Sequence, residues 1–149
     1  MTTTSISSVD FDKIAKQISL YPDTDTIDFL KNKPWWREFH NDINAHLQHF
    51  LPNTHVVAMP DCESFYTNFI TKSQFYSGET VKIIKMRRSE CHLNCKNLYK
   101  KGKIDAVVFG YALSTDGLFR AHSWGILNDQ VIETTEQRLV YFGYKISDN

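Results

Sequence analysis

The sequence predicts an α+β fold, in which a helical N-terminal part packs on a largely antiparallel β-sheet. Two observations support this class. Apolar residues recur at helical spacing through the first third of the chain and then change to short runs typical of strands. Tight turns separate several of these runs, and such turns favour antiparallel neighbours. We expect one domain over 1–149, with its helical part over about 8–51 and its sheet-rich part over about 54–149.

Three helices are predicted in the N-terminal part. The first covers residues 9–21, and Ser7 or Ser8 is its expected cap. A short helix is expected over 26–31, and a longer one over 34–51. The longer helix has Pro34 in its first turn, Pro52 as its stop and an apolar stripe made of Trp36, Phe39, Ile43, Leu47 and Phe50.

The second part contains six predicted strands and two predicted helices. The strands are expected over 54–60, 79–86, 104–113, 118–127, 130–135 and 139–146. One helix is expected over 62–72, and the other runs from Cys91 to near Gly102, a residue suited to a helix end. The run over 104–113 is apolar at nearly every position, which is typical of a central strand covered on both faces.

The charge balance excludes a general electrostatic attraction to nucleic acid or anionic lipid. Seventeen Lys and Arg residues balance seventeen Asp and Glu residues. Two basic runs, KIIKMRR and KNLYKKGK, can form a local patch, although such runs are usually solvated. Nothing near the start resembles a signal peptide, and no stretch reaches the ~20 apolar residues of a membrane helix. We expect no nucleic-acid or membrane partner and a cytoplasmic location, with export lacking a cleavable signal left open.

The three cysteines are the first candidates for chemistry. An odd number of cysteines without a signal peptide favours free thiols over a disulfide framework. Cys91 begins a predicted helix, where the helix dipole favours the thiolate. Cys62 follows Pro60 at another expected helix start and is the second candidate nucleophile. Cys95 lies one helical turn after Cys91.

A hairpin geometry places a histidine beside a carboxylate. If residues 128–129 form a two-residue turn, His122, Trp124 and Glu133 lie on the same face of the hairpin. His122 and Glu133 are then diagonal neighbours, with a separation of ~7 Å or less that two polar side chains can bridge. In the preceding hairpin, either Tyr111 or Phe109 is expected opposite His122, depending on the length of the turn.

These residue types suit nucleophilic catalysis on an amide. The Cys91 thiolate would attack a carbonyl carbon, and His122 would take the thiol proton and pass it to the leaving group. Glu133 would orient His122 and stabilise its charged form. Trp124, Tyr111 and Asn94 are the residues expected to line the substrate-binding cleft, with a core position open for Trp124 and a structural role open for Asn94.

The motif order resembles that of the papain-like and transglutaminase-like cysteine enzymes. The segment HSWGILNDQVIETT is similar to a transglutaminase-like stretch in which His-Ala-Trp leads, one hairpin later, to Asp-Pro-Thr. CHLN, HSW and ETT also resemble uncharacterised bacterial proteins with the same order. The resemblance covers Ser89 to about Gly143. Glu133 departs from the usual Asp or Asn, its spacing from His122 is shorter than usual, and no glutamine precedes Cys91 closely.

The resemblance implies a papain-like core and a cysteine-dependent amide hydrolase or acyl transferase. A peptidase or a glutamine deamidase acting on a protein or peptide without a cofactor fits this class best. Two alternatives stay open. One is a non-catalytic protein-binding domain on the same fold, anchored by Trp35 or Trp36. The other is a zinc-binding domain whose ligands are Cys91, His92, Cys95 and His122, although the preferred assignment has no metal site.

Overall fold

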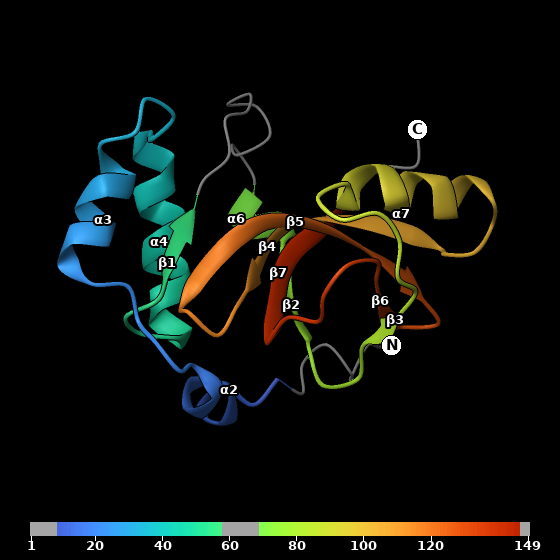
Figure 1. The fold of residues 1–149 in the computed structure, drawn as a ribbon, viewed down its shortest axis with the longest axis horizontal. Coiled ribbons are helices and arrows are strands. Elements are labelled where there is room, and N and C mark those ends of the chain that lie inside the picture. Colours follow the sequence, from blue (N-terminus) through green and yellow to red (C-terminus); the bar gives the residue numbers. More distant parts are fainter. Residues whose placement is uncertain (1–8, 58–68, 147–149) are drawn as a thin grey trace.

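The computed structural model describes residues 9–57 and 69–146 and contains a curled, mostly antiparallel sheet with helices packed against it (Figure 1). The sheet order is β2-β7-β4-β5-β6-β3, and β1 also pairs with β5. The strands are β1 (His55–Val57), β2 (Gln74–Ser77), β3 (Lys82–Ile83), β4 (Ala106–Leu113), β5 (Leu118–Leu127), β6 (Gln130–Glu133) and β7 (Val140–Ile146). The helices are α2 (Phe11–Gln17), α3 (Thr24–Lys31), α4 (Glu38–Phe50), α6 (Phe69–Lys72) and α7 (Cys91–Lys100). The α+β class is confirmed.

The long strand β5 organises the sheet. Along one edge it pairs with β4. Two strands pair along its other edge. Strand β1 pairs in parallel with residues 118–120, and β6 pairs antiparallel with residues 125–127. Among the described residues, the stretch 121–124 has no strand on this second edge. Helix α7 packs against β5 and β4, on the right of Figure 1.

The first two helices begin at aspartate caps. The Asp10 carboxylate accepts a hydrogen bond from the Lys13 N–H at 3.1 Å, and Asp23 caps α3 in the same way. Helix α2 is shorter than expected because the N–H groups of Ser19 and Leu20 bond to the carbonyl of Thr115 instead of continuing the helix. The predicted caps Ser7 and Ser8 lie outside the described residues.

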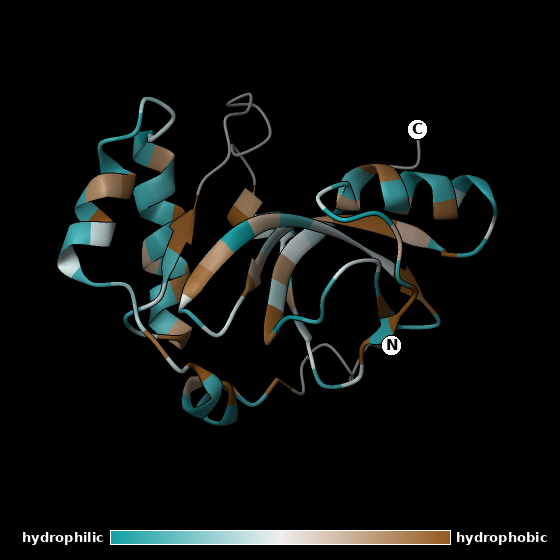
Figure 2. Cartoon of the chain, in the orientation of Figure 1, coloured by the Kyte–Doolittle hydropathy of each residue, from teal (hydrophilic) through white to brown (hydrophobic). Residues whose placement is uncertain are grey.

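Helix α4 begins four residues after Pro34, later than expected. Its first turn is closed by His40, whose Nδ1 accepts a hydrogen bond from the Arg37 N–H at 2.9 Å. Trp36 therefore precedes the helix, and its ring stacks on that of His55 with centroids 5.5 Å apart. Figure 2 shows apolar positions alternating with polar ones along α4, as expected of a half-buried helix.

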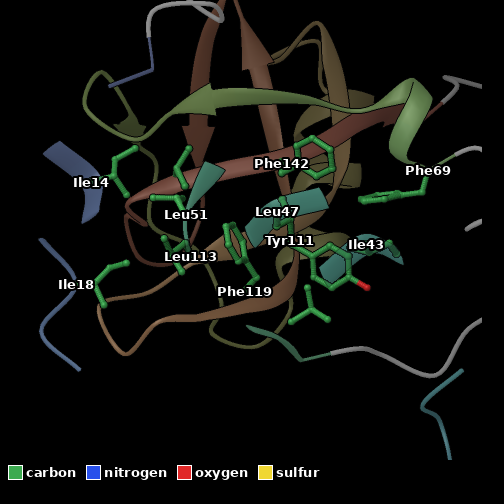
Figure 3. Close-up of a cluster of buried hydrophobic side chains, with 12 residues drawn as sticks. Ile14, Ile18, Ile43, Leu47, Leu51, Phe69, Tyr111, Leu113, Phe119 and Phe142 are labelled. Atoms are coloured by element: carbon green, nitrogen blue, oxygen red, sulfur yellow. The ribbon is translucent and has the colours of Figure 1, made fainter. Parts of the chain in front are cut away.

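Three apolar clusters hold the sheet and helices together. The largest joins α2 and α4 to one face of the sheet, and Figure 3 shows its members Ile43, Leu47, Tyr111, Phe119 and Phe142 among others. A second, which includes Val108, Trp124 and Tyr141, lies on the opposite face, and a third fills the space under α7 around Cys95, Leu98 and Ile132.

The hairpin between β5 and β6 has the predicted turn. Asn128 and Asp129 both have positive φ angles, of 52° and 64°, as a type I′ turn requires. The pairing of Leu127 with Gln130 follows from this turn. The expected relation between His122 and Glu133 depends on this register, which is confirmed.

The register between β4 and β5 corrects the sequence-based expectation. His122 lies opposite Gly110, and neither Tyr111 nor Phe109 is its partner. Leu113 pairs with Phe119, so the observed register lies between the two registers that the expected turn lengths predict. Because side chains alternate along a strand, this shift of one residue places Tyr111 on the other face, against Phe69 with centroids 5.6 Å apart.

The remaining elements differ in extent from the predictions. Strand β2 was not predicted, because its four residues have no strong apolar pattern of their own. Only the end of the helix expected over 62–72 is described, as α6, and Cys62 lies outside the described residues. Helix α7 begins and ends as expected, with Gly102 at a φ of 70°. No helix in the described part of the chain is long and apolar enough to span a membrane.

Candidate active site

Cys91 is the first residue of α7 and is half-buried. Asn94, one turn further on, fixes this end of the helix. Its amide nitrogen donates to the Arg87 carbonyl at 2.8 Å and to the Thr134 hydroxyl at 3.2 Å. The start of α7 is thereby tied both to the loop before it and to the end of β6. Asn94 itself is buried.

The thiol of Cys91 faces the second edge of β5. The backbone N–H of Ser123 and the imidazole of His122 both hydrogen-bond with this thiol. Both residues fall in the stretch 121–124, between the ends of the β1 and β6 pairings. The Cys91 thiol thus lies beside the part of this edge that no described strand covers.

His122 connects the thiol to a buried carboxylate. Its Nε2 lies 2.9 Å from Oε1 and 3.0 Å from Oε2 of Glu133. Glu133 is fully buried, and 4% of the surface of His122 is exposed. Because Nε2 is engaged by Glu133, Nδ1 is the ring nitrogen left for the thiol. The side chains of Cys91, His122 and Glu133 thus lie in a continuous series of contacts, which we call the relay, and their catalytic role stays a prediction.

Further donors hold the Glu133 carboxylate. The Tyr141 hydroxyl donates to Oε1 at 2.8 Å. The backbone N–H and the hydroxyl of Thr135 both donate to Oε2 at 2.9 Å. The Arg138 guanidinium lies 3.8 Å from Oε1. A buried carboxylate is stable only when its oxygens are hydrogen-bonded, and these contacts meet that requirement.

The electrostatics of the relay favour an ion pair between the thiolate and the imidazolium. Burial alone would raise the pKa of Cys91, but His122 and the Ser123 N–H outweigh it and bring that pKa below its ordinary value. Burial would lower the pKa of His122, but Cys91 and Glu133 raise it overall. The pKa of Glu133 is lowered despite burial, chiefly because of His122. His122 therefore stabilises the charged forms of both Cys91 and Glu133, and they stabilise its own, whereas the charge of Glu133 directly disfavours the Cys91 thiolate.

The neighbouring Cys95 has the opposite character. It lies on the buried face of α7 and is itself fully buried. Burial, together with the negative charges of Cys91 and Glu133, raises the pKa of the Cys95 thiol to about 12. Cys95 is therefore an inert packing residue at neutral pH. His92 is exposed beside the nucleophile, and its Nδ1 lies 3.3 Å from the Ser123 hydroxyl oxygen.

The three side chains expected in the substrate cleft are all buried. Trp124 packs between Tyr141, at 4.9 Å between centroids, and His122, at 6.2 Å. Asn94 supports the helix start, as described above. Tyr111 is on the opposite face of the sheet from His122, for the reason of register given above. Trp124 therefore packs on the ring of His122, and Asn94 supports the helix start that carries Cys91. Tyr111 belongs to the largest apolar cluster.

No three His, Cys, Asp or Glu side chains in residues 9–57 and 69–146 gather in an arrangement suited to a metal ion. The zinc alternative also requires the Cys95 thiolate, which its high pKa disfavours.

The comparison of the chain with protein-family models, curated proteins and solved structures finds no match. The case for an enzyme therefore depends on the geometry of the relay itself.

Tyr141 and Thr135 are the site residues that sequence reasoning missed. Tyr141 belongs to β7, which pairs with β4 and not with the β5–β6 hairpin. A sequence signal did exist. A tyrosine inside an apolar strand usually has a buried partner for its hydroxyl, and the Glu133 carboxylate, already expected beside His122, was a candidate for that partner.

Proposed function

We propose that this protein is a cysteine-dependent amide hydrolase or acyl transferase, of the peptidase or glutamine deamidase type. The single observation that supports this most is the continuous relay from Cys91 through His122 to the buried Glu133. A buried carboxylate hydrogen-bonded to a histidine that contacts a nucleophile has the role of orienting that histidine as a general base and stabilising its charged form.

The proposed reaction has four steps. The Cys91 thiolate attacks the carbonyl carbon of an amide, and the N–H groups at the start of α7 face the developing oxyanion. The imidazolium of His122 gives its proton to the leaving amine or ammonia as the carbon–nitrogen bond breaks. The resulting neutral His122 then takes a proton from water or an acceptor amine. That acceptor attacks the thioester and releases Cys91.

The papain-like and transglutaminase-like superfamily is the proposed relationship. It is supported by a cysteine at a helix start, a histidine on a long strand and a carboxylate on the adjacent strand. The longer glutamate in place of Asp or Asn is accommodated by its contacts with Tyr141 and Thr135.

An acyl-trapping experiment tests this function without knowledge of the natural substrate. The protein is mixed with 4-nitrophenyl acetate, whose acetyl group passes to Cys91 as nitrophenolate leaves. We expect a burst of nitrophenolate equal to the enzyme concentration and an acetyl group on the Cys91 peptide by mass spectrometry. Cys95→Ala should retain the burst, whereas Cys91→Ala should abolish it. Acetylation spread evenly over cysteines and lysines would contradict the proposal.

A further inference from the structure

A hollow next to Glu133 is separate from the thiol. It has a volume of about 460 Å³ and is open to solvent. Its walls come from the segment after β3, the β4–β5 connection and the β6–β7 connection. This volume lies within the range of small-ligand sites in proteins.

The lining of the hollow is positive and rich in hydroxyls. Lys85 and Arg138 supply two positive charges, and Ser114, Thr115 and Thr135 supply hydroxyl groups. Glu136 is the one acidic residue of the lining, and its carboxylate is already 3.9 Å from the Arg88 guanidinium. The chain as a whole has no net charge, so the positive character of this hollow is local.

The hollow is also joined to the relay through two of its residues. Arg138 lies 3.8 Å from Oε1 of Glu133, and Thr135 donates two hydrogen bonds to Oε2. A ligand that binds to Arg138 therefore changes the electrostatic potential at the Glu133 carboxylate. Arg138 is held in place by its own bond to the carbonyl of Glu136 and by its N–H bond to the Tyr141 hydroxyl at 3.1 Å.

We infer that this hollow binds a small oxyanion of the phosphate class through Lys85 and Arg138. Guanidinium and ammonium groups with nearby hydroxyls are the donors that phosphate prefers. The hollow has room for a phosphate ester as well as for free phosphate. A bound oxyanion would screen Arg138 from Glu133 and so change the reactivity of Cys91. This second part depends on the proposed function, whereas binding itself does not.

Binding is tested on the full-length protein by ¹H–¹⁵N NMR titration with inorganic phosphate and, separately, with O-phosphoserine. We expect saturable shifts of the Lys85, Thr135 and Arg138 amides with a Kd on the order of 1 mM. Lys85→Gln should weaken binding about tenfold. Lys82→Gln, three residues before Lys85 and outside the hollow, should leave it unchanged. Tighter binding of O-phosphoserine would assign a phosphorylated ligand, and tighter binding of phosphate the free ion.

Three results would overturn the oxyanion site. The first is a linear response to phosphate, and the second is an equal response to potassium chloride at matched ionic strength. The third is an equal loss of binding in Lys85→Gln and Lys82→Gln. Coupling is measured by the alkylation rate of Cys91, which should change with the same midpoint as the shifts. A constant rate across a saturating titration overturns the coupling. If Cys91 is inert at every phosphate concentration while the shifts saturate, the proposed function fails and the binding site stands.

Discussion

The Nε2 atom of His122 lies almost equally far from both oxygens of Glu133, at 2.9 and 3.0 Å. A single N–H therefore faces the carboxylate as a whole. Each oxygen also accepts from a donor of its own, Tyr141 on one side and Thr135 on the other. These hydrogen bonds prevent the Glu133 carboxylate from rotating and thereby hold the ring of His122 in one orientation.

Glu133→Gln should lower the pKa of His122. The carboxylate raises that pKa by its hydrogen bond and its charge, and the neutral amide retains little of either effect. The amide NH₂ also faces a donor, either Tyr141 or Thr135, so we expect a loss of about 1–3 kcal/mol in unfolding free energy. NMR titration of the His122 ring measures the first effect and urea unfolding the second. An unchanged His122 pKa would contradict the account.

Tyr141→Phe should move the pKa of His122 in the opposite direction. The hydroxyl neutralises part of the charge on Oε1, so without it the carboxylate attracts the His122 proton more strongly. The same NMR titration should show a higher pKa for His122. Tyr76→Phe is the matched control, because Tyr76 is buried in the same cluster but bonds to Gln74 instead. A fall in the pKa, or an equal change in the control, would refute a positioning role for Tyr141.

Asn94→Ala should release the start of α7. Its amide nitrogen donates to Arg87 and Thr134, and its loss leaves the buried Thr134 hydroxyl and the partly buried Arg87 carbonyl without this donor. We expect a loss of about 1–3 kcal/mol in unfolding free energy and slower alkylation of Cys91. Asn97→Ala, on the same helix and half-buried, is the control and should leave Cys91 unaffected. Normal alkylation in Asn94→Ala would show that Asn94 does not position the nucleophile.

The relay should stabilise the fold within a limited pH range. Glu133 has a lowered pKa, so its contribution is present above its ordinary pKa of 4.5 and is lost as the pH falls through the folded value. His122 has a raised pKa, so its contribution is complete below 6.5 and is lost as the pH rises through the folded value. The difference in unfolding free energy between the wild type and Glu133→Gln should therefore be largest between about pH 5 and 6.5. A difference that is flat from pH 3 to 9 would contradict this.

Local sequence signals were sufficient for the relay but not for its surroundings. The Asn128-Asp129 turn sets the register of β5 and β6, and through it the distance from His122 to Glu133. The position of Cys91 follows from the helix that begins there. Both features arise within short segments, where turn chemistry and periodicity are strong guides.

The errors arise where pairing is not local. The register of β4 against β5 is shifted by one residue from those that the turn sequence predicts, so Tyr111 was placed on the wrong face. Tyr141 reaches Glu133 only because β7 pairs with β4, across the sheet from the hairpin. Strand β2 forms only because β7 offers it an edge. Tertiary contacts, and not local preference, determine these features.

The most direct test of the account is the rate of iodoacetamide labelling at each cysteine as a function of pH, read by mass spectrometry. In the wild type, Cys91 should react with an apparent pKa below the ~8.5 of a free thiol, and Cys95 should stay inert across neutral pH. In His122→Ala the apparent pKa of Cys91 should rise, since its main stabilising partner is gone. Labelling of Cys91 that is as slow as that of Cys95, or that is unaffected by His122→Ala, would contradict the relay and the function proposed from it.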